Sequence, residues 1–379
     1  MLLTPTTMAS TGEAIARDPS GRVVFVPGAL PGEEVLAEIE AERPKSATAR
    51  LVSVGTPSPD RVAPPCPEVA RGCGGCGWQH IRLEAQRRHK EEIVAAALRF
   101  ASVDPPDFPP TVALEPWGFR TSVRAAVTGG RAGFHAARSH DMVAVAGCMV
   151  LHPLLAPLLT GCRYPGADAV LLRCGASTGE RMAATTPAGR GAGLPADVHP
   201  GWVHEDVAGR RWRVSAGSFF QSRPDGAEAL VRLVTDGAGG DPGTALDLYS
   251  GVGLFAGVLA ERGWSVTAVE STASAVRDAR HNLKGSRAQV VRADATRWAP
   301  PVADLVVADP PRVGLGRRGV AVVAASAAGR LVLVSCDAVS LGRDAALLAR
   351  EGFRLASVQL VDLFPQTAHV EVVSVFERA

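Results

Sequence analysis

Short apolar runs recur through the last third of the chain, and longer segments with a helical spacing of apolar residues separate them. The runs predicted as buried strands lie at 244–248, 265–269, 289–293, 305–308 and 331–334. Segment 271–284 is predicted as a helix, and a helical pattern also follows the first strand. Strands that alternate with helices indicate an α/β domain with a mostly parallel sheet.

The first of these strands carries Asp247 and runs directly into a turn with closely spaced glycines. Gly251 and Gly253 let the backbone approach a nucleotide-sized ligand, and the next helix offers free N–H groups at its start. A glycine pair after a strand is often only a turn. This motif alone therefore leaves a ligand site and a structural turn about equally open.

Acidic residues close three successive strands of the predicted sheet. Glu270 follows the second strand, Asp294 the third and Asp309 the fourth. The carboxyl ends of parallel strands meet at the edge where open α/β sheets bind ligands, and an acid after the second strand can accept hydrogen bonds from ribose hydroxyls. One such acid could be an ordinary strand-end carboxylate, but the series predicts a nucleotide-like cofactor beside all three.

Candidates for a nucleophile and a base lie closer to the C-terminus. The fifth strand ends in Ser335-Cys336-Asp337, so the Cys336 thiol is predicted at the same edge as Asp309. A buried cysteine is usually inert packing, but a thiolate at this edge could attack a bound substrate. Glu371 lies beside an apolar run that would bury it, so its carboxylate is either paired or functional.

The first sixty residues follow a different pattern. Short strands are predicted at 13–17, 21–26, 34–39 and 49–54, separated by glycine and proline turns, which suits a small oligonucleotide-binding (OB)-like β-barrel. Basic residues recur across it at Arg17, Arg22, Arg43, Lys45 and Arg50. They could follow a phosphate backbone, and a solvated barrel surface explains them equally well.

A cysteine-rich segment comes after a proline-rich linker at 58–65. Cys66, Cys73 and Cys76 lie close together among glycines, which in a cytosolic chain indicates a metal site rather than disulfides. Candidates for a fourth ligand are, in order of preference, Cys148, then Cys162 and Cys174, then His80 and His152. Four thiolates suit an iron–sulfur cluster or a structural zinc ion, and the local spacing does not distinguish the two.

Between these regions the pattern is less regular. Segment 82–101 is predicted as an amphipathic helix with mostly solvated Arg and Glu side chains, and 119–127 with 131–135 as a hairpin. A helix from about 224 to 234 leads into the glycine turn. Gln221 precedes it at the entrance to the α/β domain, where it is a ligand contact or an ordinary loop glutamine.

Length, composition and net charge limit the possible size, location and partners of the protein. The chain has 379 residues, of which 46% are hydrophobic, enough for two or three cores. It has neither a leader-like start nor an apolar run of about eighteen residues, so we expect a cytoplasmic protein without a membrane partner. A net charge of +2 does not by itself indicate a nucleic-acid partner.

Taken together with Asp309-Pro-Pro-Arg312, Phe364-Pro-Gln-Thr367 and His369-Val-Glu371, these motifs resemble the bacterial RNA uracil-C5 methyltransferases, which make 5-methyluridine in transfer and ribosomal RNA. The resemblance covers nearly the whole chain. It implies an α/β fold: a Rossmann-like class I methyltransferase domain at 221–379, an N-terminal TRAM or OB-like RNA-binding barrel at 1–60, and a small cysteine-cluster domain at 61–220. We expect a monomer that acts on transfer or ribosomal RNA.

The resemblance also implies roles for individual residues. The S-adenosylmethionine contacts that it implies are Gln221, Tyr249, Gly251, Leu254, Glu270 and Asp309, to which we add Asp294 as the acid after the third strand. Cys336 would be the nucleophile and Glu371 the proton acceptor. The iron–sulfur-containing members imply a 4Fe–4S cluster on Cys66, Cys73, Cys76 and Cys148, with zinc as the alternative.

Three positions depart from the family pattern. Asp337-Ala338 stands where Asn-Pro is usual, Arg223 where the Phe-x-Gln segment continues to Asn, and Leu254 where a residue is often polar. These departures bear on the fine geometry of the site, because the nucleophile, the base and the strand-end acids are all present.

The implied reaction makes chemical sense of Cys336 and Glu371. Uracil C5 is a weak nucleophile, so the thiolate would add to C6 and activate C5, which takes the methyl group; Glu371 would then remove the C5 proton and the thiolate would leave. Alternatives are a nicotinamide-dependent iron–sulfur oxidoreductase, a non-catalytic RNA-binding protein, and a methyltransferase that makes 5-methylcytidine.

Overall fold

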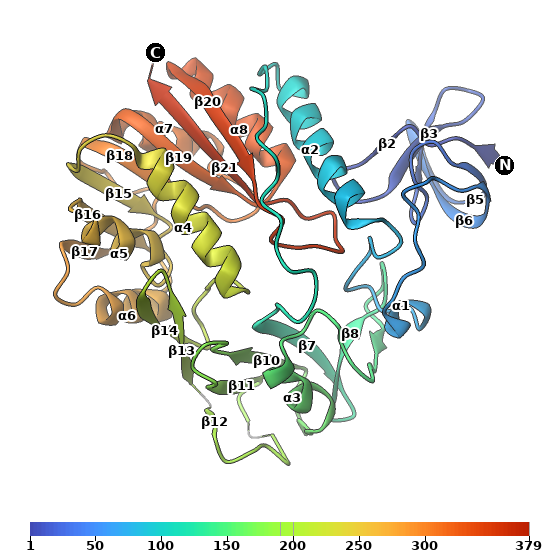
Figure 1. The fold of residues 1–379 in the computed structure, drawn as a ribbon, viewed down its shortest axis with the longest axis horizontal. Helices are drawn as coiled ribbons and strands as arrows, with labels where there is room; N and C mark the ends of the chain where they lie inside the picture. The colour runs from blue at the N-terminus through green and yellow to red at the C-terminus, as the bar shows by residue number, and fades with distance from the viewer. Residues whose placement is uncertain (190, 200, 379) are drawn as a thin grey trace.

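A computed structural model describes residues 1–189, 191–199 and 201–378. In this part of the chain the strands form two six-stranded sheets, one seven-stranded sheet and a two-stranded hairpin (Figure 1). The seven-stranded sheet is built from the last third of the sequence. The alternation of strands and helices predicted there is confirmed.

The N-terminal sheet has the strand order β1-β5-β6-β4-β3-β2. Its members are β1 (Leu2–Leu3), β2 (Thr7–Met8), β3 (Ala14–Arg17), β4 (Val23–Val26), β5 (Glu34–Arg43) and β6 (Ser46–Thr56). Side chains alternate between more and less buried positions along β4 and the first half of β5, because one face covers a core and the other faces solvent. On the exposed side Arg22 and Arg50 form ion pairs with acidic neighbours.

The central sheet has the order β12-β11-β10-β7-β8-β9. Its members are β7 (Ser122–Thr128), β8 (Arg131–His135), β9 (Met142–Val143), β10 (Ala169–Cys174), β11 (Arg181–Thr186) and β12 (Val198–His199). Its short helical segments are α1 (Pro67–Ala70), η1 (Pro153–Leu155) and α3 (Ala156–Thr160). β7 and β8 form the predicted hairpin, and Cys162 and Cys174 lie in the apolar core beneath this sheet.

The C-terminal sheet has the order β17-β16-β15-β18-β19-β21-β20. Its members are β15 (Thr244–Leu248), β16 (Ser265–Glu270), β17 (Ala288–Arg292), β18 (Ala303–Ala308), β19 (Ala327–Ser335), β20 (Phe353–Leu360) and β21 (Val372–Arg378). The first five are parallel, and β21 pairs antiparallel with both neighbours. The strand order reverses between β15 and β18, and open sheets bind ligands at such a reversal.

Helices cover both faces of the C-terminal sheet (Figure 1). They are α4 (Pro224–Ala238), α5 (Leu254–Glu261) and α6 (Ala273–Asn282) on one face, and α7 (Gly316–Ser326) and α8 (Ala338–Arg350) on the other. Leu331 and Leu333 of β19 belong to the core under α7 and α8, whereas Val332 and Val334 belong to the core under α4 and α5. Burial on both sides explains why these strands read as continuous apolar runs.

The hairpin of β13 (Trp202–Val207) and β14 (Arg210–Ser215) packs against α6. The N–H and hydroxyl of Ser215 donate to Asp278 at 2.8 and 2.7 Å. Asn282 also bonds the backbone of Arg213. These bonds attach the hairpin to the C-terminal α/β unit.

Helix α2 (Leu83–Phe100) joins the N-terminal and C-terminal parts of the molecule. Its Ile93, Val94 and Leu98 belong to one continuous core that reaches from the N-terminal sheet to α8. The approach to α8 is close: a Cβ atom on Gly342 would lie 2.5 Å from the carbonyl oxygen of Ala97. In the described ranges of the chain, no helix combines the length and the hydropathy that a membrane span requires.

Candidate active site and cysteine cavity

The glycine turn after β15 has the backbone that its sequence predicts. Gly251 and Gly253 have φ angles of +55° and +92°, and Tyr249 also lies in the left-handed region at +62°. A Cβ atom on Gly253 would lie 2.9 Å from Cδ1 of Leu283, so a larger residue would be both strained and crowded. Leu254 is buried at the first position of α5.

Glu270 joins this turn to the end of the neighbouring strand. Its carboxylate accepts hydrogen bonds from the N–H groups of Gly251 (3.0 Å) and Thr272 (2.6 Å). The carbonyl of Glu270 accepts from Ala293 at 3.1 Å, so Asp294 follows directly beside it. The structure thus brings Gly251, Glu270 and Asp294 to one edge, in agreement with the predicted series of strand-end acids.

Asp247 is a fully buried carboxylate within the strand that leads to the turn. One oxygen accepts from the N–H of Ala256 at 2.9 Å, and the other has no hydrogen-bond partner among the described residues. Burial raises the pKa of Asp247 to about 8, and the nearby charges of Asp309 and Glu270 add to the rise. Burial thus favours the neutral form of this carboxyl, and its bond to Ala256 connects the turn to α5.

The segment before α4 borders the same turn. A Cβ atom on Gly251 would lie 3.8 Å from the carbonyl oxygen of Phe219, and Gln221 is buried two residues further on. Arg223 is also fully buried: it pairs with Asp225 at 2.6 Å and donates to the carbonyl of Glu115 at 2.9 Å. The departure from the family pattern at position 223 is therefore an internal packing contact.

Cys336, Asp309 and Glu371 meet at the carboxyl edge of the C-terminal sheet. Cys336 follows β19, Asp309 follows β18, and Glu371 is buried directly before β21. Burial raises the pKa of Cys336 to about 11, and the charges of Glu371 and Asp309 contribute to the rise. Burial also raises the pKa of Asp309 to about 7, and raises that of Glu371 well above its ordinary value with help from Asp309.

Arg312 is the cation at this edge. Its Nη2 lies 3.3 Å from both ring nitrogens of His369, and its charge lowers the pKa values of Cys336 and Glu371. Burial, together with the charge of Arg312, lowers the pKa of His369 to about 4, so the imidazole is neutral near pH 7. The sequence motif contained Arg312, but its effect on the thiol was not evident without the structure.

A groove of about 510 Å³ opens in front of Cys336. Separate parts of the chain line it: the N-terminal sheet region at 10–13 and 27–28, the cysteine segment at 74–75 and 77–78, Ile93 of α2, and the C-terminal segments at 336–338 and 367–370. Arg138 and Arg312 also line it. The groove is therefore large enough for a nucleotide-sized group, and it carries the acidic side chains of Glu13 and Asp337 as well as the two arginines.

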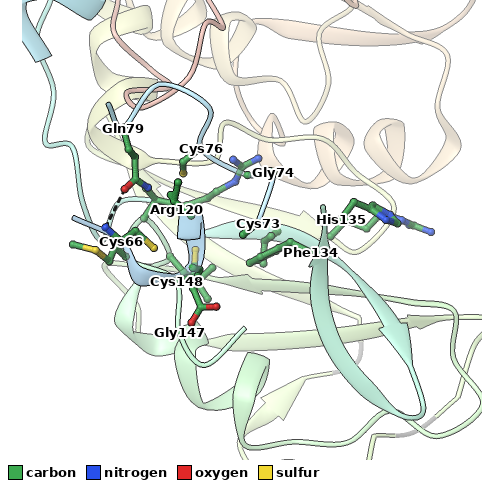
Figure 2. Close-up of a pocket in the computed structure, with 18 residues that line it drawn as sticks. Cys66, Cys73, Gly74, Cys76, Gln79, Arg120, Phe134, His135, Gly147 and Cys148 are labelled. Atoms are coloured by element: carbon green, nitrogen blue, oxygen red, sulfur yellow. Dashed lines mark hydrogen bonds between the residues drawn. The ribbon is translucent and has the colours of Figure 1, made fainter. Parts of the chain in front are cut away.

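A second cavity, of about 350 Å³, contains the predicted cysteine set. Cys66, Cys73, Cys76 and Cys148 all line it, and Figure 2 shows them around Arg120. The candidate fourth ligand Cys148 is thus brought to the other three. Cys162, Cys174, His80 and His152 are not among the residues that line this cavity within the described ranges.

The thiols of this cavity are in a desolvated environment that favours their neutral form. Burial raises the pKa values of Cys73, Cys76 and Cys148, in the case of Cys76 to about 11, and the neighbouring thiols add to the rise. The side chain of Gln79 accepts from the N–H of Cys66 at 3.1 Å (Figure 2). In the part of the chain that the structure describes, no three His, Cys, Asp or Glu side chains lie close enough together to hold a single metal ion.

Comparisons with known proteins agree with this geometry. A TRAM domain model matches residues 2–52. An uncharacterized RNA methyltransferase of Streptomyces coelicolor is 36% identical over 98% of this chain and 91% of its own length. A 23S rRNA (uracil(1939)-C(5))-methyltransferase of Alkalilimnicola ehrlichii is 33% identical over 98% of this chain and 95% of its own length.

A solved structure has the same overall fold. It is the tRNA (uracil-54, C5)-methyltransferase of Pyrococcus abyssi in complex with S-adenosyl-L-homocysteine. The two structures align with a TM-score of 0.78 over 99% of this chain and 100% of the other, at 22% sequence identity. The arrangement of an N-terminal TRAM domain before a class I methyltransferase fold is thereby confirmed.

Proposed function

This chain belongs to the RNA uracil-C5 methyltransferases, and we propose that it transfers a methyl group from S-adenosylmethionine to C5 of an RNA uridine through a covalent bond between Cys336 and the base. The observation that carries the proposal is the convergence of Cys336, Glu371 and Asp309 on one sheet edge, beside the glycine turn. Two acids and a thiol in a half-buried site are the groups that this reaction requires.

S-adenosylmethionine supplies the methyl group when it is bound at the turn. We assign its contacts to Gln221, Tyr249, Gly251, Leu254, Glu270, Asp294 and Asp309. The support is that the turn after β15 and Asp309 after β18 lie at the reversal of the strand order. Glu270, at the end of β16, bonds this turn, Asp294 follows beside Glu270, and Gln221 is buried near the turn. An adenosyl group has ribose hydroxyls that a carboxylate such as Glu270 can bind.

The proposed chemistry starts with the thiol. Loss of the Cys336 proton gives a thiolate that attacks C6, and the electron pair of the C5–C6 bond moves towards O4 to form an enolate. C5 then takes the methyl group. Glu371 accepts the C5 proton, the C5–C6 double bond re-forms, and the bond from C6 to sulfur breaks, which returns the thiolate.

The raised pKa of Glu371 is useful for this step. A carboxylate whose pKa lies well above its ordinary value is a stronger base than an exposed glutamate. Arg312 acts in the opposite sense on Cys336: it stabilises the thiolate that burial and the two acids disfavour. The site therefore holds a carboxyl group that is a strong base once it is ionised, and a thiol whose ionisation is favoured by Arg312.

We propose that RNA occupies the groove in front of Cys336. The C5 and C6 atoms of a stacked uridine are inaccessible, so the target must be unpaired or flipped out. The groove is shared by the TRAM region, the cysteine segment and the C-terminal unit, which suits an extruded nucleotide with RNA on either side.

Ribosomal RNA is the first substrate to test, and transfer RNA the second. The relative from Alkalilimnicola ehrlichii is named for 23S rRNA, at 33% identity over nearly the whole chain. The structural neighbour from Pyrococcus abyssi is named for tRNA but shares only 22% identity. We therefore give more weight to the ribosomal substrate.

We further propose that Cys66, Cys73, Cys76 and Cys148 hold a 4Fe–4S cluster. A single zinc ion needs four sulfurs at about 2.3 Å from one point, whereas in a cluster each iron takes one cysteine and the ligands are more widely spaced. A cavity of about 350 Å³ with four cysteines on its wall fits the larger group. We assign it a structural role, because Cys73 and Cys76 adjoin the residues of this segment that line the groove in front of Cys336.

The proposed function is tested with purified protein and separate ribosomal and transfer RNA pools from cells that lack 5-methyluridine. Labelled S-adenosylmethionine should give 5-methyluridine at one position in one pool, located by nuclease mapping and nucleoside mass spectrometry. 5-Methylcytidine as the product, or no transfer to either pool by folded and metal-replete protein, would contradict the proposal.

A further inference from the structure

The loop between β20 and β21, residues 361–371, separates the two strands and ends at Glu371. Its ends are joined, because the N–H of Val361 donates to the carbonyl of Glu371 at 2.9 Å. Residues 367–370 of this loop line the groove together with Cys336. The conformation of the loop therefore determines the positions of His369 and Glu371 relative to the groove.

Gln366 lies at the centre of this loop in an unfavourable backbone conformation. Its φ angle is +69°, a left-handed value that costs a non-glycine residue about 1–2 kcal/mol. Its side chain is nevertheless buried. A conformation of this kind persists only where the surrounding structure fixes it.

The group that fixes Gln366 is the side-chain amide of Gln86, on the first half of α2. Oε1 of Gln86 accepts from the backbone N–H of Gln366 at 2.7 Å, and Nε2 of Gln86 donates to Oε1 of Gln366 at 3.0 Å. Nε2 also lies 3.0 and 2.8 Å from the carbonyl oxygens of Trp78 and Ile81. Because backbone N–H groups only donate and carbonyls only accept, these partners fix the orientation of the amide.

Trp78 completes the connection. Its N–H donates to the carbonyl of Gln366 at 2.9 Å, and its indole Nε1 donates to the carbonyl of Gly12 at 2.8 Å. Trp78 lies two residues after Cys76 and is almost fully buried. One set of hydrogen bonds thus joins the N-terminal sheet region, the cysteine segment, α2 and the loop.

One helical turn further along, α2 holds the loop a second time. Nζ of Lys90 lies 2.7 Å from Oδ1 of Asp362 and donates to the carbonyl of Phe364 at 2.9 Å. Positions 86 and 90 are four residues apart, so they lie on the same face of the helix. The same helix contacts α8, which starts directly after Cys336, where Gly342 approaches Ala97.

We propose that Gln86 is a positioning residue for the reaction: its amide fixes Gln366 and so holds the loop 361–371 in register with Cys336. The inference rests on the proposed roles of Cys336 and Glu371. Gln86 contacts no reacting group. It acts through the loop 361–371. Because α2 also contacts α8, the helix that follows Cys336, one helix positions both the loop and the segment that carries the nucleophile.

The test compares Gln86→Met, which keeps the length of the side chain but removes four hydrogen-bond contacts, with Gln289→Met, the same change at an exposed position of β17 that removes one hydrogen bond, to Thr267. We expect kcat of Gln86→Met to fall by roughly 10- to 100-fold through misplacement of the base. The KM for S-adenosylmethionine should not change, and protein–RNA adduct should accumulate because C5 proton removal is slowed. Gln289→Met should behave as the wild type.

Gln366→Gly serves if Gln86→Met does not fold. Glycine removes the left-handed strain and keeps both backbone bonds to Gln86 and Trp78, but loses the bond to the side-chain oxygen. A melting temperature equal to or above that of the wild type, together with a reduced kcat and adduct accumulation, would show positioning rather than folding.

An unchanged kcat in folded Gln86→Met, or in Gln366→Gly, would overturn the inference. A variant that loses cofactor affinity and RNA affinity together with a lower melting temperature would also overturn the inference, because these joint losses would indicate a structural role alone. Failure of the proposed function has a different signature: Cys336→Ala would remain active, whatever the Gln86 variants do.

Discussion

The N–H of Gly251 donates to Oε2 of Glu270 at 3.0 Å, across a separation of nineteen residues. This bond joins the glycine turn to the end of β16 and orients the carboxylate at the carboxyl edge of the sheet. The carboxylate also accepts from Thr272, so its direction is set before any ligand binds. Such preorganisation favours binding, because less freedom is lost when the ligand arrives.

Replacement of Glu270 should weaken binding of S-adenosylmethionine. A hydrogen bond to a charged group contributes about 1.5–3 kcal/mol, so Glu270→Ala should lower affinity roughly 10- to 150-fold. Activity should return in part at high cofactor concentration. Titration calorimetry measures the change, with the exposed Glu228→Ala on α4 as the control. Equal affinity of Glu270→Ala and wild type would show that the assigned cofactor site is wrong.

The cysteine cavity gives a second prediction. Protein purified without oxygen should be brown, with broad absorbance in the visible blue, and Cys73→Ser should lose both colour and iron. Cys162→Ser is the matched control, because Cys162 lies outside the cavity and donates to the carbonyl of Gly193. Because the site is structural, loss of the metal should reduce folding stability or RNA binding. Colourless wild type with one equivalent of zinc would contradict the cluster.

The third prediction concerns Arg312 and the reactivity of Cys336. The cation lowers the pKa of the thiol, so Arg312→Met should raise that pKa further above about 11 and reduce the thiolate fraction at any given pH. Alkylation of the Cys336 peptide, followed by mass spectrometry in the absence of RNA, should therefore need a higher pH. Arg312→Lys should keep most of the effect. Faster alkylation of Arg312→Met than of wild type would refute the assigned sign.

A fourth prediction follows from the raised pKa of Glu371. The native state favours the protonated carboxyl, so its contribution to stability is complete below the unfolded pKa near 4.5 and is lost as pH rises through the folded pKa. Gln does not titrate. The melting temperature of Glu371→Gln relative to wild type should therefore be higher at pH 8 than at pH 4.5. A difference that is the same at both pH values would mean that Glu371 is not perturbed.

The fold of the C-terminal unit could be predicted because its signals are local. β19 is buried on both faces, which gives a continuous apolar run at 331–334, and Gly251 and Gly253 are required where the backbone has positive φ angles. The acids Glu270 and Asp309 could be placed because parallel strands bring their carboxyl ends to one edge. These inferences need no knowledge of distant partners.

The connections through α2 could not be predicted in the same way. Gln86, Lys90 and Ile93 share one face of the helix. In the sequence, Gln86 and Lys90 are polar residues at positions of the apolar stripe. Their partners lie 280 residues away in the case of Gln366 and 272 in the case of Asp362. The sequence predicted an amphipathic helix with solvated charged residues. The structure shows that this helix also buries a lysine, Lys90, and a glutamine, Gln86.

The covalent mechanism is tested most directly by what two single variants accumulate with RNA and S-adenosylmethionine. Glu371→Gln should allow addition and methyl transfer but not loss of the C5 proton, and so give a protein–RNA adduct that survives denaturing electrophoresis. Cys336→Ala should bind RNA and cofactor yet give neither product nor adduct, and the double variant should give no adduct. Continued turnover by Cys336→Ala, or normal turnover by Glu371→Gln without any adduct, would contradict the mechanism.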